Sequence, residues 1–132
     1  MSAAVKVIVI EDDDGLRRAL QRLLNAAGFE CVTYASAEAL LHETLDPRTC
    51  CLVCDQNLPA MSGLELLATL HQRKIRVPLV LMTAFDTPGL RARADRGGAA
   101  GYLVKPFSRS ALVEAIGSAI ALSGSPVRPS VQ

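Results

Sequence analysis

Residues 50–55 form the apolar run Cys50-Cys51-Leu52-Val53-Cys54 closed by Asp55, and the turn-rich segment Gln56-Asn57-Leu58-Pro59-Ala60-Met61-Ser62-Gly63 follows directly. A short apolar run bounded by turn residues is typical of a buried strand, so Asp55 is expected to end a strand and face a loop. The run 5–10 ends in a similar way, in Glu11-Asp12-Asp13-Asp14. As parallel neighbours, two such strands would gather their acidic groups at one edge of a sheet.

Strand-like and helical segments alternate along the chain. They lie at 5–10, 14–27, 29–34, 36–46, 50–55, 63–73, 78–83, 87–96, 100–104 and 108–122. The strand runs are apolar at nearly every position, as expected when helices cover both faces of a parallel sheet. Right-handed crossovers then favour a three-layer, doubly wound α/β fold, with five helices and five parallel strands in the flavodoxin-like order 2-1-3-4-5.

Length and charge narrow the class of protein. The 132 residues suit a single domain, assigned here to 1–122, because 123–132 has the composition of a flexible, linker-like tail. With 14 basic and 13 acidic side chains, no general field attracts nucleic acid or an anionic membrane, so neither is expected as a direct partner. The apolar stretches are strand-sized and no signal core is evident, which predicts a cytoplasmic protein.

The cysteines are Cys31, Cys50, Cys51 and Cys54. The spacing of Cys51 and Cys54 occurs in metal and redox pairs, but residues three apart on a strand point to opposite faces. Buried free thiols that fill the core are therefore predicted.

Capping residues mark the helix ends. Asp13 or Asp14 is expected to cap the first helix, Gly28 to end it, and Ser108 to cap the last helix.

The fourth helix, 87–96, has the weakest apolar face. Thr87-Pro88 makes a good start, but Leu90 is its only large apolar residue, so the segment is predicted to be among the more mobile ones. A solvated basic face is favoured over a partner-docking surface for Arg91, Arg93 and Arg96.

Polar groups at the strand ends suit phosphoryl transfer. A hard divalent cation would relieve repulsion among Glu11, Asp12 and Asp55, and Mg²⁺ is favoured because it tolerates few carboxylates alongside phosphate oxygens. Asp55 would act as a nucleophile and form an acyl phosphate. Lys105 would supply positive charge and Thr83 a hydrogen bond to the phosphoryl group. Helix capping is the alternative for the acidic cluster, although it does not account for Asp55.

Four segments occur in order along the chain. They are Ile10-Glu11-Asp12-Asp13, Asp55 with Leu58-Pro59 and Met61-Ser62-Gly63, Met82-Thr83-Ala84, and Tyr102-Leu103-Val104-Lys105-Pro106-Phe107. Together they resemble the receiver domains of two-component response regulators. The resemblance covers about 5–122. The strand-end segments look most like receivers of the nitrogen-fixation regulator type, whose full-length members usually add a DNA-binding helix-turn-helix.

The resemblance implies a role for each pocket residue. Asp55 would accept phosphate from a sensor histidine kinase or a phosphotransfer protein. Mg²⁺, for which Mn²⁺ is expected to substitute, would be held by Asp12, Asp55 and the backbone carbonyl of Asn57, with Glu11 assisting through water. Lys105 and Thr83 would hold the phosphoryl group. Glu11 stands where a second aspartate is commoner in the family, and its longer arm still permits the water-mediated contact.

The resemblance also implies a switch. Tyr102 would turn inward when Thr83 moves toward the phosphate, which alters the surface formed by 87–96, 100–104 and 108–122, and receivers often form homodimers through that surface. A half-buried packing residue with a solvated hydroxyl is the alternative reading of Tyr102. Lys105-Pro106 is expected to be cis. Asn57 and Phe85 occupy positions that tune acyl-phosphate lifetime, and Phe85 is hypothesised to shield the phosphoryl group from water.

The resulting expectation is a signalling phosphoacceptor rather than an enzyme, limited to self-phosphorylation and autodephosphorylation. One alternative is a pseudo-receiver that binds a partner constitutively, although every acidic, threonine and lysine position is present. Another is a magnesium-dependent phosphatase acting on external substrates. Such phosphatases generally carry a second aspartate where this chain has Asn57.

Overall fold

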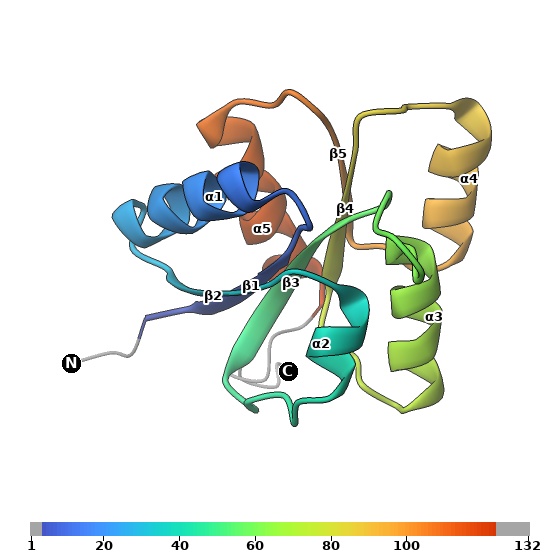
Figure 1. Ribbon diagram of the computed structural model, residues 1–132, viewed down its shortest axis with the longest axis horizontal. Coiled ribbons are helices and arrows are strands. Elements are labelled where there is room, and N and C mark those ends of the chain that lie inside the picture. The colour runs from blue at the N-terminus through green and yellow to red at the C-terminus, as the bar shows by residue number, and fades with distance from the viewer. Residues whose placement is uncertain (1–3, 124–132) are drawn as a thin grey trace.

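The apolar runs pair as parallel strands in one open sheet of order β2-β1-β3-β4-β5 (Figure 1). The computed structural model describes residues 4–123. The strands are β1 Lys6–Ile10, β2 Glu30–Tyr34, β3 Thr49–Asp55, β4 Leu79–Thr83 and β5 Gly101–Val104. The helices are α1 Asp14–Ala26, α2 Ala37–Leu41, α3 Gly63–Gln72, α4 Pro88–Arg96 and α5 Arg109–Leu122. The predicted fold class and strand order are confirmed.

Two apolar cores lie on opposite faces of the sheet. Helices α1 and α5 pack on one face, and α2, α3 and α4 cover the other (Figure 1). The fully buried strand residues explain why the strand runs show no polar alternation, since both faces are covered. Large side chains with almost no exposure include Ile10, Leu24, Leu40, Leu52, Leu66, Leu81 and Ile116.

The helices begin at the predicted caps. Asp13 Oδ1 accepts a hydrogen bond from the N–H of Leu16 at 3.0 Å, and Ser108 Oγ accepts one from Ala111 at 3.0 Å. Thr87 caps α4 in the same way. Gly28 follows α1 with a φ of 98°, a left-handed conformation that favours glycine.

Helix α2 is shorter than predicted and ends at Leu41 rather than at residue 46. Pro47 disfavours a helical conformation at Asp46, and the Asp46 carboxylate forms a local turn by accepting a hydrogen bond from the N–H of Arg48 at 2.8 Å. The segment after Leu41 therefore turns toward β3 instead of continuing the helix.

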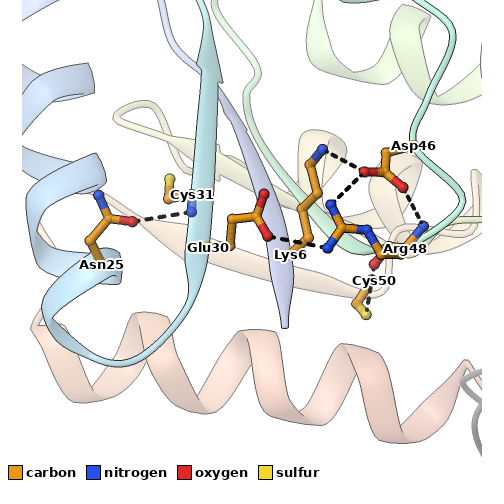
Figure 2. Close-up of polar contacts among 7 residues, drawn as sticks. All are labelled: Lys6, Asn25, Glu30, Cys31, Asp46, Arg48 and Cys50. Atoms are coloured by element: carbon orange, nitrogen blue, oxygen red, sulfur yellow. Dashed lines mark hydrogen bonds and ion pairs between the residues drawn. The ribbon is translucent and has the colours of Figure 1, made fainter. Parts of the chain in front are cut away.

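A charged cluster joins this turn to β1 and β2 at the sheet edge where the strands begin (Figure 2). Lys6 Nζ lies 3.0 Å from Asp46 Oδ2, and an Arg48 guanidinium nitrogen lies 2.9 Å from the same oxygen. Arg48 also lies 3.6 Å from Glu30. The cluster fixes the α2–β3 connection and therefore the start of β3, the strand that carries Asp55.

Cys31, Cys51 and Cys54 are buried and free, as predicted. Burial raises the pKa of the Cys31 thiol to about 11 and that of Cys51 to about 12, so these groups stay protonated. The prediction is wrong for Cys50, which is partly exposed. The pairing of β1 with β3 shifts register between Lys6 and Val7, which leaves Cys50 as the extra residue of a bulge.

Helix α4 buries only Leu90 and Ala94, in agreement with its weak apolar face. Its expected mobility stays a prediction. Among residues 4–123, no helix is long and apolar enough to cross a bilayer. The proposed tail, apart from Ser123, lies outside the described residues, and the boundary at 122 stays a prediction.

Candidate functional site: an acidic pocket at the sheet edge

Three carboxylates meet where β1 and β3 end. Ile10 pairs with Cys54 across these neighbouring strands, so Glu11 and Asp55 leave the sheet side by side. Ligand oxygens of Glu11, Asp12 and Asp55 all lie within 4.8 Å of one another. Glu11 is 2% exposed and Asp55 4% exposed, whereas Asp12 is exposed to solvent. The gathering of acidic groups expected from the strand ends is confirmed.

Lys105 reaches into this cluster from the loop after β5. Its Nζ lies 2.8 Å from Glu11 Oε1 and 3.0 Å from Asp55 Oδ1. The N–H of Lys105 donates to the carbonyl of Thr83 at 2.8 Å, which holds the loop against the end of β4. The Lys105-Pro106 peptide is cis, as the family resemblance implied.

Burial and ion pairing shift the pKa values of this pocket in opposite directions. Burial raises the pKa of Glu11, although the hydrogen bond from Lys105 partly counteracts it. Burial alone would lower the pKa of Lys105, but its hydrogen bonds to Glu11 and Asp55 and their charges outweigh burial and raise the pKa. Lys105 therefore stays a cation at neutral pH.

Glu11 is held in place from several sides. Its N–H donates to the carbonyl of Tyr34 at 3.1 Å, its Oε2 accepts from the N–H of Asp13 at 3.1 Å, and Arg17 donates to its carbonyl at 2.9 Å. The glutamate found where an aspartate is commoner thus reaches Lys105 directly. The water-mediated role expected for Glu11 stays a prediction.

The loop after Asp55 is closed by backbone contacts. Gln56 donates its N–H to Met82 at 2.8 Å, and its own carbonyl accepts from the N–H of Gly63 at 3.2 Å. A Cβ at Gly63 would lie 2.6 Å from Leu81 Cδ1 and 2.9 Å from the Asp55 carbonyl oxygen, so only glycine fits here. Asn57 is exposed within this loop.

Thr83 ends β4 beside Asp55 and is fully buried. Its Oγ1 accepts a hydrogen bond from the N–H of Phe85 at 2.9 Å, while the Phe85 side chain is 68% exposed. Tyr102 is partly exposed on β5, and its hydroxyl donates to Asp86 Oδ1 at 2.9 Å. The structure thus brings Glu11, Asp12, Asp55 and Lys105 into one pocket and leaves Tyr102 at the surface.

The basic residues of α4, Arg91, Arg93 and Arg96, are exposed as expected, and Arg91 makes one further contact. The Arg91 guanidinium lies 4.3 Å from the centre of the Tyr102 ring. Asp86, which no sequence pattern singled out, joins the two residues. The three residues lie in different elements, so no helical or strand period relates them and only the folded chain reveals this cluster.

The donor set fits a hard divalent cation. Glu11 and Asp55 share the ammonium of Lys105. The exposed carboxylate of Asp12 lies beside them, so the pocket keeps an excess of negative oxygen ligands, the type Mg²⁺ prefers. This acidic cluster is typical of the magnesium site of a receiver.

A parallel 2-1-3-4-5 sheet with an acidic pocket and a lysine at its carboxyl edge defines the receiver class. The chain matches the family described as response regulator receiver domain over residues 7–117. It belongs to this family, whose members are signalling phosphoacceptor modules rather than conventional enzymes and partner with histidine kinases.

Relatives of known name are transcriptional and nodulation regulators. The chain is 37% identical over 110 residues to nodulation protein W of Bradyrhizobium diazoefficiens, covering 83% of this chain and 48% of that protein. It is 34% identical over 123 residues to the transcriptional regulatory protein FixJ of Azorhizobium caulinodans, covering 93% of this chain and 58% of FixJ. The chain therefore spans about half the length of these relatives.

Solved structures agree with the fold. The crystal structure of FixJ-N superposes with a TM-score of 0.80 at 32% identity, covering 92% of this chain and 96% of that one. The response regulator StyR gives a TM-score of 0.82 at 36% identity, covering 92% of this chain and 62% of that one. The predicted resemblance to the nitrogen-fixation regulator type is confirmed.

Proposed function

We propose that Asp55 accepts a phosphoryl group from the phosphohistidine of a sensor histidine kinase or phosphotransfer protein and so controls a partner or effector. The observation that carries the proposal is the position of the Asp55 carboxylate, which is buried, 3.0 Å from Lys105 Nζ, and within 4.8 Å of Glu11 and Asp12 oxygens. An isolated structural ion pair would not require the two further carboxylates.

In the proposed transfer, an Asp55 carboxylate oxygen attacks phosphorus. The new O–P bond forms as the P–N bond to the donor imidazole breaks, and the electron pair of that bond stays on the imidazole nitrogen. Lys105 offsets negative charge on the transferred group, and the Thr83 hydroxyl donates a hydrogen bond to it. Attack of water on the same phosphorus reverses the modification and releases inorganic phosphate.

We assign the metal ligands to Asp12, Asp55 and the backbone carbonyl of Asn57, with Glu11 acting through water. Bound Mg²⁺, or Mn²⁺ in its place, would supply positive charge that lets the acidic pocket accept an anionic phosphoryl group. Asn57 and Phe85 are proposed to tune the lifetime of the acyl phosphate, Phe85 by shielding it from water.

Signalling would follow from rearrangement at Thr83. A hydroxyl can donate and accept at once, so it is the proposed movement of Thr83 toward the phosphoryl group, and not the donation itself, that would weaken its present bond with the N–H of Phe85. The added group carries about −1.5 to −2 charge, which biases a two-state surface. Tyr102 is proposed to turn inward in response, changing the α4/β5/α5 surface and enabling homodimer formation there. By analogy with its relatives, the chain is proposed to act in the cytoplasm, and its balanced charge supports the absence of direct contact with DNA.

Intact mass spectrometry after incubation with acetyl phosphate tests the proposal. Wild type should gain one phosphate only with Mg²⁺, and Asp55→Asn should gain none. Because fast hydrolysis can hide an adduct, binding of beryllofluoride is measured in parallel by NMR at Thr83 and Tyr102. Absence of both the adduct and the beryllofluoride shifts would favour a pseudo-receiver that binds its partner constitutively.

A further inference from the structure

Three side chains from different elements form a cluster beside α4. Asp86 lies in the β4–α4 loop, Arg91 in α4 and Tyr102 in β5. The Tyr102 hydroxyl donates to Asp86 Oδ1 at 2.9 Å. The Arg91 guanidinium covers the Tyr102 ring at 4.3 Å and lies 3.5 Å from Asp86 Oδ2. Every member of the cluster thus contacts the other two.

The Asp86 loop also carries a contact of the pocket residue Thr83. The N–H of Phe85, the residue before Asp86, donates to Thr83 Oγ1 at 2.9 Å. A Thr83 side chain that moves toward a phosphoryl group draws its Oγ1 away from this N–H. Since Asp86 is the next residue, rearrangement of the loop also disturbs its bond to Tyr102. The pocket and the surface cluster are therefore linked through two adjacent residues.

We propose that Asp86 and Arg91 are positioning residues that hold Tyr102 at the surface of the unphosphorylated chain and so oppose activation. The inference rests on the proposed function, because it assigns an energetic threshold to that switch. Asp86 holds the hydroxyl and Arg91 covers the ring face, so Tyr102 cannot turn inward without losing both contacts. A hydrogen bond to a carboxylate is stronger than one between neutral groups, and the guanidinium adds a cation–π contact.

The cluster also shapes the proposed output surface. Arg91 and Tyr102 line a groove of about 600 Å³ between α4 and β5. Release of Tyr102 would remove one wall of this groove and free the Arg91 side chain. The same contacts that hold Tyr102 therefore keep the surface in its unphosphorylated shape.

Linkage gives a quantitative test. If the cluster favours the inactive state over the active state by some factor, removing the cluster must strengthen binding of a phosphoryl mimic by up to that factor. Beryllofluoride affinity in the presence of Mg²⁺ should rise roughly three- to tenfold in Asp86→Ala, and Arg91→Ala should change it in the same direction. The matched control is Asp95→Ala, which removes an exposed carboxylate of α4 that forms no ion pair with any residue between 4 and 123.

A double-mutant cycle separates this role from a general loosening of the loop. In a Tyr102→Phe background, Asp86→Ala should have a clearly smaller effect, because the hydroxyl bond is already gone and only the contact of Asp86 with Arg91 remains to be lost. In the free protein, Tyr102 ring resonances of Asp86→Ala should shift toward their positions in the beryllofluoride complex of wild type. A merely structural role for Asp86 would not produce that shift.

The outcomes separate the two proposals. If wild type binds no beryllofluoride, the proposed function fails and the inference falls with it. If wild type binds but Asp86→Ala has unchanged affinity, or Asp95→Ala tightens binding equally, the holding role of the cluster is overturned while the phosphoacceptor function stands. Full additivity of Asp86→Ala and Tyr102→Phe would overturn it as well.

Discussion

Lys105 Nζ lies 3.0 Å from Asp55 Oδ1, a contact that joins the loop after β5 to the end of β3. The same ammonium lies 2.8 Å from Glu11. Lys105 therefore offsets part of the negative charge of the pocket, and it competes for carboxylate oxygens that a divalent cation would also use. The residue proposed to assist phosphoryl transfer is thus also expected to weaken metal binding.

Lys105→Met should separate these two effects. Without the ammonium, the carboxylates attract Mg²⁺ more strongly, so Mg²⁺ affinity rises. Modification by acetyl phosphate slows by about tenfold or more, because a positive charge beside the transferred group is lost. Mg²⁺ titration by NMR and intact mass against time measure the two quantities. Arg93→Met, a change at an exposed cation on α4, is the control, and Mg²⁺ affinity unchanged from wild type would contradict the competition.

Gly63→Ala should destabilise the domain. The added methyl would lie 2.6 Å from Leu81 Cδ1 and 2.9 Å from the Asp55 carbonyl oxygen, and one of these neighbours is backbone. Overpacking of this kind costs about 1–3 kcal/mol of the free energy of unfolding. Gly117→Ala on α5 is the matched control, because a methyl group added there would meet nothing within 4 Å and alanine favours a helix by about 1 kcal/mol.

Urea denaturation of both glycine variants gives the comparison. The expected signs are opposite, with a lower midpoint for Gly63→Ala and a higher one for Gly117→Ala. Equal stability of Gly63→Ala and wild type would show that the loop after Asp55 can move aside.

The acidic pocket was predictable from sequence because it depends on short-range patterns. An apolar run that ends in a carboxylate places that group at a strand end, and parallel pairing brings the ends of β1 and β3 together. Caps such as Asp13 and Ser108 were predictable for the same reason, since each side chain bonds an N–H only three residues away.

Contacts between distant elements were not predictable in this way. Nothing in the spacing of Arg91 and Tyr102 indicates that a guanidinium would cover the ring. Likewise, Asp46, in the connection after α2, pairs with Lys6 on a strand far away in the sequence. Such contacts arise from the side-by-side placement of loops after folding, and no local periodicity encodes them.

The Asp46 turn predicts a specific loss of stability in acid. The N–H of Arg48 holds the pKa of Asp46 well below its ordinary value of 3.8, and the Arg48 guanidinium and Lys6 lower it further. A carboxyl whose pKa is depressed by folding contributes stability above its unfolded pKa and loses that contribution as the pH falls. The stability advantage of wild type over Asp46→Asn should therefore be present at neutral pH and shrink below about pH 4.

Urea midpoints measured across this pH range test the Asp46 prediction. Arg48→Gln is the control, since it removes the guanidinium but keeps the backbone N–H, the largest cause of the shift. Arg48→Gln should keep most of the acid dependence. A constant difference between wild type and Asp46→Asn at every pH would rule out the contribution of this carboxylate.

Phe85→Ala should shorten the lifetime of the acyl phosphate without destabilising the fold. Phe85 follows the pocket residue Thr83 by two positions and is bonded to it through its N–H, while its ring is 68% exposed and buries little area. If the ring restricts the approach of water to the phosphoryl group, its removal speeds hydrolysis several-fold, and Phe85→Leu, which keeps an apolar side chain, stays closer to wild type. Intact mass followed over time after removal of acetyl phosphate gives the decay rates. A half-life identical in wild type and Phe85→Ala would assign the lifetime to other groups, with Asn57 the first to examine.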